Sequence, residues 1–367
     1  MDVPSKLRSI LDPFIDDLRA RETISGIGLF GSWSRGDAAP SSDVDLLIVE
    51  SKDFDYEYVE RVEVNNCLVD LNYVPKRWVT HRVPPEIDQK IYETKVIFDR
   101  DGSLTKAKNL MLKVYWRPER VEIRTEAHLI EADTYIGRAR MAFNRGDYQS
   151  TKFNSILGFC SLMKILTEIG KKPILSSFFI RNLESASKNL NMHSLYENYV
   201  KLMGLADLSK ADVKVMLNML SSVWRSIMDF TAINFSFTKS FHPKVSAKLN
   251  YYRHENFLKG LIARLMDLTE EAHIESAHYM FHVLADAITH YAFLLSAVEG
   301  VRFDYATTMK HISESKSSPA EIYHGAVNIL NIKDVSKGEA EETLKSVTEA
   351  ALNIRRKRKD LISQFIG

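Results

Sequence analysis

Two aspartates one residue apart, Asp43 and Asp45, follow a Gly-Ser turn (Gly31 and Ser32) and directly precede an apolar run, Leu46 to Val49. In a strand, side chains at i and i+2 point to the same face, so these carboxylates would project together, about 6–7 Å apart. Two carboxylates that close repel each other unless a cation lies between them. Hard divalent ions such as Mg²⁺ bind carboxylate and phosphate oxygens together. The spacing therefore predicts metal-dependent chemistry on a phosphate.

The whole segment resembles the signature of the polymerase-β-like nucleotidyltransferases, which include the kanamycin and minimal nucleotidyltransferases. That signature is a Gly-Ser turn, an Arg35-Gly36 pair and the sequence Ser-Asp-Val-Asp-Leu at Ser42–Leu46. Members carry a third carboxylate between apolar residues of a neighbouring strand, and Asp70, between Val69 and Leu71, fits. An acid in such a position is costly to bury unless it is paired or metal-bound. The resemblance covers roughly the first 100 residues.

The resemblance implies a catalytic site with two Mg²⁺ ions and an NTP, with ATP as the first candidate. Asp43 and Asp45 would hold both ions, and Asp70 would complete the nucleophile side and help to deprotonate the acceptor. Gly31 would let the backbone approach the triphosphate, and Ser32 would donate its hydroxyl to a terminal phosphate at a helix N-terminus. Arg35 either adds positive charge there or is a solvated helix residue.

The reaction that this implies is transfer of a nucleoside monophosphate to a hydroxyl acceptor. A small-molecule acceptor is favoured; a protein side chain that receives AMP and an RNA end are the alternatives. Ordinary turn and capping roles would explain each motif residue singly, but not their joint spacing. A rival of another class is a nucleotide-sensing or scaffold protein built on an inactive transferase domain.

The composition is that of a globular protein. The 367 residues are 45% hydrophobic and 26% charged, with a formal net charge of +1. The length favours two or three domains, and the charge gives no overall bias toward nucleic acid, which is not a favoured partner. The two cysteines, Cys67 and Cys160, are interpreted as free thiols of a reducing compartment. With no evident signal peptide and no apolar run near 18 residues, we expect a cytoplasmic protein without a membrane; a homodimer is left open.

The expected fold class is α+β. Residues 1–105 form a small mixed-sheet domain: a helix over 4–21, a strand at Ile24–Phe30, a short helix, a second strand, and a hairpin around Asn65-Asn66. The first helix has apolar residues at Leu7, Ile10, Leu11, Phe14, Ile15 and Leu18. A helical stretch from Pro84 to Tyr92 and a strand at Lys95–Asp99 complete the domain.

The chain from residue 106 onward is almost entirely helical and contains a repeat. Residues 207–217 align with residues 334–344, at an offset of 127, and each Asp-x-Ser-Lys is interpreted as a helix start. This predicts two helical bundles, 106–245 and 246–367, unless the likeness is chance similarity between amphipathic helices. The segment Tyr135 to Gly170 resembles HEPN bundles, but Arg124 and His128 are one residue too close for the HEPN ribonuclease motif.

The helical region adds weaker candidates. Lys152 and Lys164 would bind phosphate, and Tyr148 would stack on the base, in a cleft between the first domain and the first bundle; contact with water only is the alternative. Four polar residues on one helix, four apart, could chelate a metal in neighbouring pairs, although a polar stripe is favoured. They are His278, His282, Asp286 and His290. The basic run Arg355–Lys359 is interpreted as a solvated helix end, with RNA phosphates as the alternative.

Overall fold

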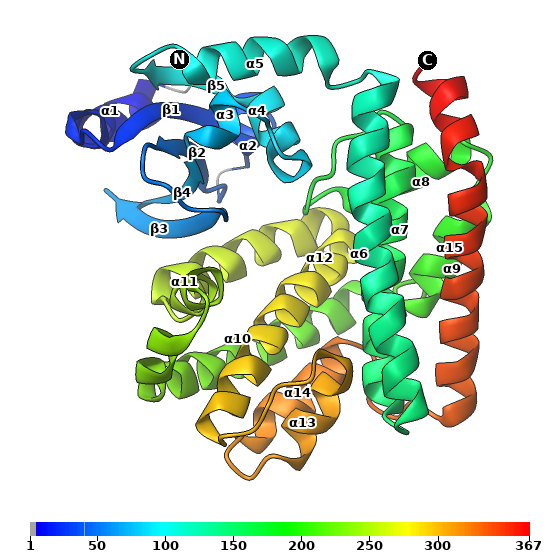
Figure 1. Ribbon diagram of the computed structural model, residues 1–367. Coiled ribbons are helices and arrows are strands. Elements are labelled where there is room, and N and C mark those ends of the chain that lie inside the picture. The colour runs from blue at the N-terminus through cyan, green and yellow to red at the C-terminus, as the bar shows by residue number, and fades with distance from the viewer. Residues whose placement is uncertain (1–4, 40) are drawn as a thin grey trace. The chain divides into compact units, whose positions relative to one another are not determined.

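Five strands form a mixed sheet in the order β3-β4-β2-β1-β5 (Figure 1). They are β1 (Ile24–Phe30), β2 (Val44–Glu50), β3 (Tyr58–Val64), β4 (Cys67–Pro75) and β5 (Lys95–Asp99). The pair β2 and β4 is parallel, and the other three pairs are antiparallel. The computed structural model describes residues 5–39 and 41–367; the side chains of Leu7 and Ile10 lie outside the described part.

Helices cover both faces of this sheet. Leu11, Ile15 and Leu18 of α1 (Ser5–Ala20) pack on one face. The other face packs against α4 (Asp88–Glu93) and α5 (Ser103–Val114) through a cluster that includes Ile91 and Leu104. The remaining helices before residue 116 are α2 (Gly31–Arg35) and α3 (Arg77–Thr80), and a 3₁₀ turn spans Pro85–Ile87. The expected helix, strands and hairpin are all present, and the α+β fold class is confirmed.

The hairpin of β3 and β4 turns through Asn65 and Asn66, whose φ angles are 49° and 65°. A two-residue turn with both central residues at positive φ matches the twist of the flanking strands, and asparagine tolerates this conformation. The turn fixes the register, since Val64 then pairs with Cys67. Continued along the ladder, the same register places Arg61 opposite Asp70.

The chain forms two compact units that differ from the three expected ranges. The first comprises residues up to Tyr115 together with 240–264, and the second comprises 116–239 and 265–367. The segment 240–264 contains α11 (Pro243–Tyr252) and the start of α12 (Glu255–Val298). Because α11 packs against β3, this part of the helical region belongs with the sheet.

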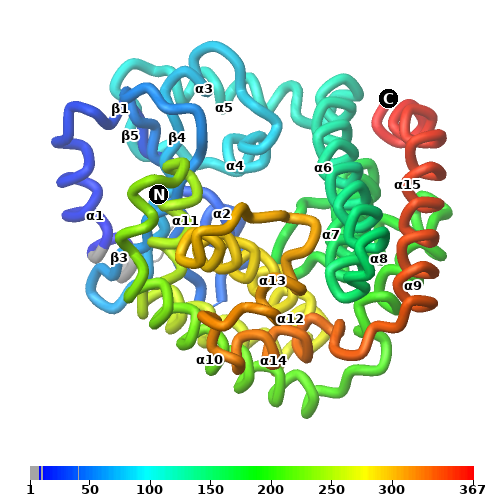
Figure 2. The backbone as a smooth tube through the Cα atoms, turned by 60° about the horizontal axis from the view of Figure 1, so that its bottom comes forward, coloured from blue at the N-terminus to red at the C-terminus, as the bar shows by residue number. Residues whose placement is uncertain are grey.

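The second unit is helical throughout its described elements. In Figure 2, α15 follows α6 and α7, and it packs against both. The unit also contains the rest of α12 and the 3₁₀ turns Phe235–Ser240 and Tyr305–Thr307. Its other helices are α6 (Pro118–Asn144), α7 (Tyr148–Ile169), α8 (Phe179–Asn189), α9 (His193–Leu202), α10 (Lys210–Ile233), α13 (Thr308–Glu314), α14 (Ala320–Ile329) and α15 (Lys337–Phe365).

The helices repeat at the offset found in the sequence. Adding 127 to the bounds of α9 gives those of α14, and adding it to the start of α10 gives the start of α15. Ser209 and Ser336 cap α10 and α15, each accepting a hydrogen bond from the backbone three residues later. However, α15 packs on α6 and α7, and α10 packs on α14. The last helix of each half therefore lies against the other half, and the two halves share one unit.

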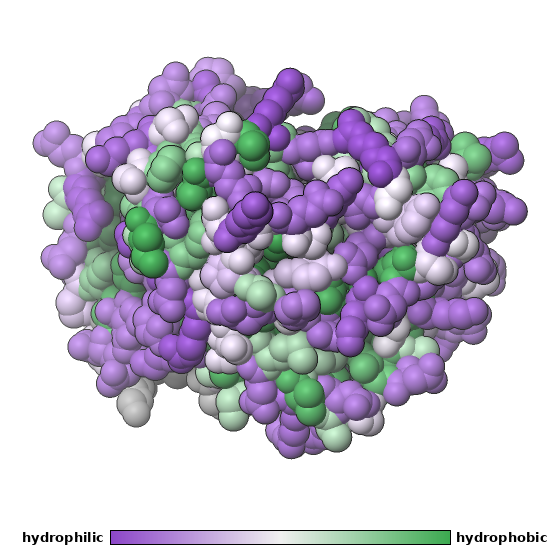
Figure 3. All heavy atoms as spheres, turned by 90° about the horizontal axis from the view of Figure 1, so that it is seen from below, coloured by the Kyte–Doolittle hydropathy of each residue, from purple (hydrophilic) through white to green (hydrophobic). Residues whose placement is uncertain are grey.

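One described helix, α12, is long and apolar enough to cross a membrane by length and composition alone. Of its most apolar window, 56% is buried within the structure, as in the core helix of a protein outside a membrane. The helix is also interrupted at Ala272, whose φ and ψ are −153° and 74°. The face drawn in Figure 3 is mostly hydrophilic, with hydrophobic side chains in small groups. The sequence had been expected to hold no such helix, and this feature remains weak evidence for a membrane.

Two glycines test the packing of the second unit. A Cβ at Gly170, at the end of α7, would lie 2.5 Å from the Cβ and 2.9 Å from the Cα of Ala186, whereas a Cβ at Gly137 in α6 would meet nothing within 4 Å. We expect Gly170→Ala to destabilise the protein by about 1–3 kcal/mol, because α7 and α8 must separate. The matched Gly137→Ala should stabilise it by about 0.5–1 kcal/mol through helix propensity. Urea unfolding measures both; changes of the same sign would contradict the packing.

Candidate active site

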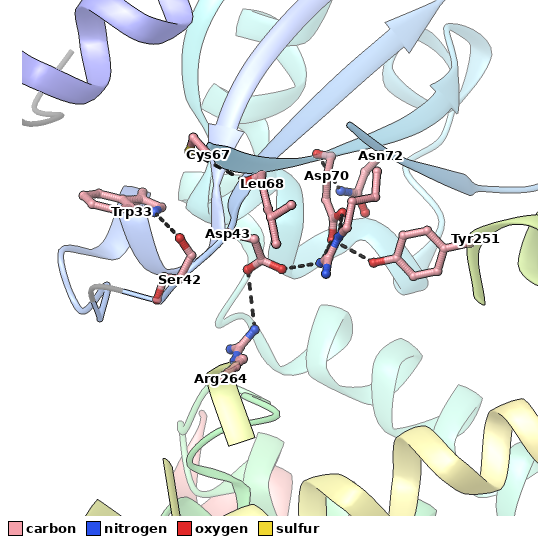
Figure 4. A network of polar contacts seen from close by, with 10 residues as sticks. Trp33, Ser42, Asp43, Cys67, Leu68, Asp70, Asn72, Tyr251 and Arg264 are labelled. Carbon is pink, nitrogen blue, oxygen red and sulfur yellow. Dashed lines mark hydrogen bonds and ion pairs between the residues drawn. The ribbon is translucent and has the colours of Figure 1, made fainter. Parts of the chain in front are cut away.

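Three carboxylates lie together on one face of the sheet. Asp45 in β2 lies directly opposite Asp70 in the parallel strand β4. Asp43 comes two residues before Asp45, immediately ahead of β2, and its side chain points toward the same place (Figure 4). Farther along both strands this face carries Leu47 and Val74, which pack against the helices below. The strand ends thus hold the acids, and the apolar residues that follow anchor them.

Gly31 closes the turn from β1 into α2 directly against Asp45. Its φ is 71°, in the region that favours glycine. A Cβ at this position would lie 2.2 Å from Oδ2 of Asp45. Any side chain here would therefore occupy the space in front of the carboxylate. The turn keeps one side of Asp45 lined by backbone alone.

A guanidinium group lies between two of the acids. Nε and Nη2 of Arg61 donate to the two oxygens of Asp70, each at 2.6 Å, and Nη2 also donates to Asp43. The Arg61 side chain is only 5% exposed. It comes from β3, where the hairpin register places it opposite Asp70. No sequence motif marks Arg61, although the two-residue hairpin turn locates it opposite Asp70.

The segment 240–264 completes this network from a distant part of the chain. Tyr251 of α11 donates its hydroxyl to Oδ2 of Asp70 at 2.9 Å, and Nη1 of Arg264 lies 3.6 Å from Oδ1 of Asp43 (Figure 4). The rings of Tyr251 and Phe257 lie 5.5 and 5.4 Å from the Arg61 guanidinium carbon. Both are cation–π distances. The guanidinium is thus enclosed by acids on one side and aromatic rings on the other.

Negative charge is in excess at this site. Burial raises the pKa of Asp45 well above its usual range, and the charges of Asp43 and Asp70 raise it further. Burial also raises the pKa of Asp70, although its hydrogen bonds from Arg61 oppose that shift. Among the described residues Asp45 forms no ion pair or hydrogen bond. A cluster that already binds one cation and leaves a carboxylate unpaired has the oxygen donors that Mg²⁺ prefers.

Two other motif residues lie in α2, beside the acids in sequence. Arg35 forms ion pairs with Asp37 at 3.2 Å and with Glu93 at 2.6 Å, so its charge is already balanced by two carboxylates. The Ser32 hydroxyl makes no hydrogen bond within the described part of the chain. Of the two, Ser32 is the better placed to bind a ligand.

The candidates from the helical region belong to the second unit and have partners there. Lys152 forms an ion pair with Glu339 at 2.8 Å, and Lys164 forms one with Glu131 at 3.1 Å. The Tyr148 ring lies 5.9 Å from the ring of Phe143. Both lysines thus have intramolecular roles, and their binding of phosphate stays a prediction.

The basic run in α15 is mostly solvated, as the sequence predicts, because Arg355, Arg356, Lys357 and Lys359 are all exposed. Arg355 and Lys359 pair with Asp133 and Glu122 of α6, at 2.6 and 3.2 Å. Arg358 is buried and bonds to Glu126 of the same helix. The run therefore holds α15 against α6 through charge pairs.

The comparisons with known proteins bear on the unit that contains the acids. The model of a family of nucleotidyltransferase domains matches residues 11–106. This part of the chain is a nucleotidyltransferase domain. The match includes the Gly-Ser turn and Asp43, Asp45 and Asp70. It ends before the helical region, about which it says nothing.

Individual relatives add less. A protein of Methanocaldococcus jannaschii, whose name proposes a protein adenylyltransferase, is 49% identical over 45 residues. That match spans 12% of this chain and 45% of the relative, less than half of its length. A nucleotidyltransferase-like protein from Exiguobacterium sibiricum has a TM-score of 0.35 and 15% identity, over 76% of this chain and 80% of its own. At those values the structural likeness supports no conclusion.

The guanidinium in the nucleotidyltransferase domain can be tested as a counter-ion. We expect Arg61→Met to destabilise the protein by about 3–5 kcal/mol, because it leaves Asp70 and Asp43 without their buried cation. Added Mg²⁺ should stabilise this variant more than the wild-type protein, since it no longer competes with the guanidinium. Urea unfolding with and without MgCl₂ measures both effects.

The matched control is Arg77→Met, which removes an exposed pair with Asp53 and should cost less than about 1 kcal/mol. An Arg61→Met variant as stable as this control, or no more responsive to Mg²⁺ than the wild-type protein, would contradict the assignment.

Proposed function

We propose that this protein is a Mg²⁺-dependent nucleotidyltransferase that moves a nucleoside monophosphate from an NTP, with ATP as the first candidate, to a hydroxyl acceptor. The observation that carries the proposal is the convergence of Asp43, Asp45 and Asp70 within the nucleotidyltransferase domain. Asp43 and Asp70 bind the Arg61 guanidinium, and Asp45 faces the turn at Gly31, where a side chain would not fit.

Asp43, Asp45 and Asp70 would hold the metal. Bound Mg²⁺ would neutralise phosphate charge and lower the pKa of the acceptor hydroxyl. The Arg61 guanidinium now occupies both oxygens of Asp70 and one of Asp43, so it would have to move before Asp70 could hold the metal. The unpaired Asp45 needs no such movement.

The remaining groups would bind and orient the nucleotide. The Ser32 hydroxyl can donate a hydrogen bond to a phosphate oxygen, and the bare backbone at Gly31 leaves room for that phosphate. A guanidinium displaced from Asp70 is itself suited to phosphate, because its planar donors bind two oxygens at once. Arg61 would then follow the negative charge from the carboxylates to the substrate. Asp70, released from Arg61 and Tyr251, would accept the proton of the acceptor hydroxyl.

A small-molecule acceptor remains the first candidate. The second is a protein hydroxyl that receives AMP, and the name of the Methanocaldococcus jannaschii relative favours it. The formal charge of +1 argues modestly against a long RNA acceptor. If nucleotide binds but is never transferred, a nucleotide-sensing protein is the better description.

Transfer from α-labelled ATP in fractionated cell lysate tests the reaction and the acceptor class together. We expect label to appear on an acceptor with Mg²⁺ and not with EDTA. Label that precipitates with acid indicates a macromolecule, and label that stays in solution indicates a small molecule. Asp45→Asn should reduce the rate by more than the roughly 10–100-fold that loss of an outer-shell group costs. Asp37→Asn, an exposed acid in the same segment, is the matched control and should retain activity.

Thermal unfolding separates binding from transfer. ATP with Mg²⁺ should raise the melting temperature, and the double variant Asp43→Asn, Asp45→Asn should lose the metal-dependent part of that rise. No shift with any NTP would rule out the transferase. A shift without transfer to any lysate fraction would favour the sensing protein.

A further inference from the structure

Four polar side chains that the proposed transfer reaction does not use meet in the interior of the second unit. They are Cys160 of α7, Tyr199 of α9, and His278 and His282, one turn apart on α12. One ligand atom from each of Cys160, His278 and His282 lies within 4.8 Å of the others. The Tyr199 hydroxyl lies 2.9 Å from Nε2 of His278 and 3.2 Å from Nε2 of His282.

The structure divides the four-residue polar stripe predicted on α12 into two pairs with different partners. His290 instead turns its Nδ1 toward the Asp286 carbonyl at 2.8 Å. Asp286 also lies 3.5 Å from His290, whereas His278 and His282 converge with side chains from other helices. The third and fourth groups, Cys160 and Tyr199, come from other helices, so no sequence pattern on α12 could have shown them.

Two of the distances are close to the edges of a tetrahedral metal site. With metal–nitrogen bonds of about 2.0–2.1 Å, two ligands of a tetrahedral ion lie about 3.3 Å apart. The hydroxyl-to-imidazole distances are close to that value. Cys160, Tyr199 and His278 are buried, at 5%, 0% and 4% exposure, and His282 is partly exposed. Three of the four side chains are thus enclosed, and His282 lies at the edge of the cluster.

The protonation states also suit a metal. Burial lowers the pKa of His278 well below its usual range and that of His282 to about 3, so both imidazoles are neutral at pH 7 and keep a lone pair. Burial raises the pKa of the Cys160 thiol, which stays protonated until a cation binds. The charge of Lys164 also lowers the pKa of both histidines, and Lys164 forms an ion pair with Glu131 at 3.1 Å.

We propose that Cys160, His278 and His282, with Tyr199 as the fourth group, bind one zinc-type divalent ion. Sulfur and imidazole donors in a tetrahedral set select Zn²⁺ over Mg²⁺. Binding converts the Cys160 thiol to a thiolate and releases its proton, with no change of oxidation state. Cys160 and Tyr199 belong to the first repeat and the histidines to the second. The ion thus joins the two halves of the second unit.

Cobalt(II) is the probe, because a thiolate ligand gives it a charge-transfer band in the near ultraviolet. The full chain carrying Asp45→Asn, which disables the carboxylate site, is stripped with chelator, dialysed and titrated with CoCl₂. We expect one equivalent to bind with that band and with the visible bands of tetrahedral cobalt. Zn²⁺ should displace it and raise the melting temperature.

Matched variants assign the ligands. Cys160→Ser should abolish the charge-transfer band, whereas Cys67→Ser, the other free cysteine, should leave it unchanged. His282→Gln should weaken binding by more than about 100-fold, and His290→Gln on the same helix should not. Circular dichroism checks that each variant is folded. If Cys160→Ser does not fold, the loss of cobalt binding in His282→Gln tests the proposal instead.

A folded parent protein that binds no cobalt, or binds it without the charge-transfer band, would overturn the proposal. So would a band that survives in Cys160→Ser. In either case the four side chains are a polar cluster of the core, in which the Tyr199 hydroxyl forms hydrogen bonds with Nε2 of both imidazoles.

Discussion

Repulsion between like charges governs the first unit. At an effective dielectric of about 20, two carboxylates roughly 5 Å apart repel each other by about 3 kcal/mol, and here three share one strand end. The parallel pairing of β2 and β4 brings Asp45 opposite Asp70. A nearby cation lowers the repulsion between the carboxylates without moving them. Arg61 provides it, and the segment 240–264 encloses that guanidinium with Tyr251 and Phe257.

Much of this unit could be predicted because its determinants are local. Alternating apolar residues, the Gly-Ser turn and the Asn65-Asn66 turn lie within a few residues of the elements they specify, and the strands formed as expected. Even Arg61 was within reach, since a two-residue hairpin turn pairs residues at equal distances on either side of it. Tyr251 and Arg264 were not. Their contact with the acids depends on how 240–264 packs against β3, which no pattern in either segment encodes.

The repeat identifies the counterpart of the segment 240–264 in the first helical half. At the offset of 127, residues 118–144 of α6 correspond to residues 245–271, which cover most of α11 and the start of α12. In the first copy this stretch is one continuous helix of the second unit. In the second copy it is broken between Tyr252 and Glu255, and its first part belongs to the sheet unit. The leading helix of the first copy, α6, thus belongs to the second unit, whereas residues 245–264 of the second copy belong to the unit that contains the acids. The sheet unit therefore includes residues 240–264, which contain the start of the second bundle predicted at 246.

The two proposed metal sites differ in their donor atoms, which keeps them chemically separate. The acids of the first unit offer hard oxygen atoms, and Asp43 and Asp70 already accept hydrogen bonds from a guanidinium. The cluster around Tyr199 offers nitrogen and sulfur within a buried helix contact. Hard Mg²⁺ has little affinity for the second set, and a tetrahedral ion bound there would be held by geometry that the acids do not present. A requirement for Mg²⁺ in catalysis and an ion that stabilises the helices can therefore coexist in one chain without competition. Each can be removed while the other is left intact.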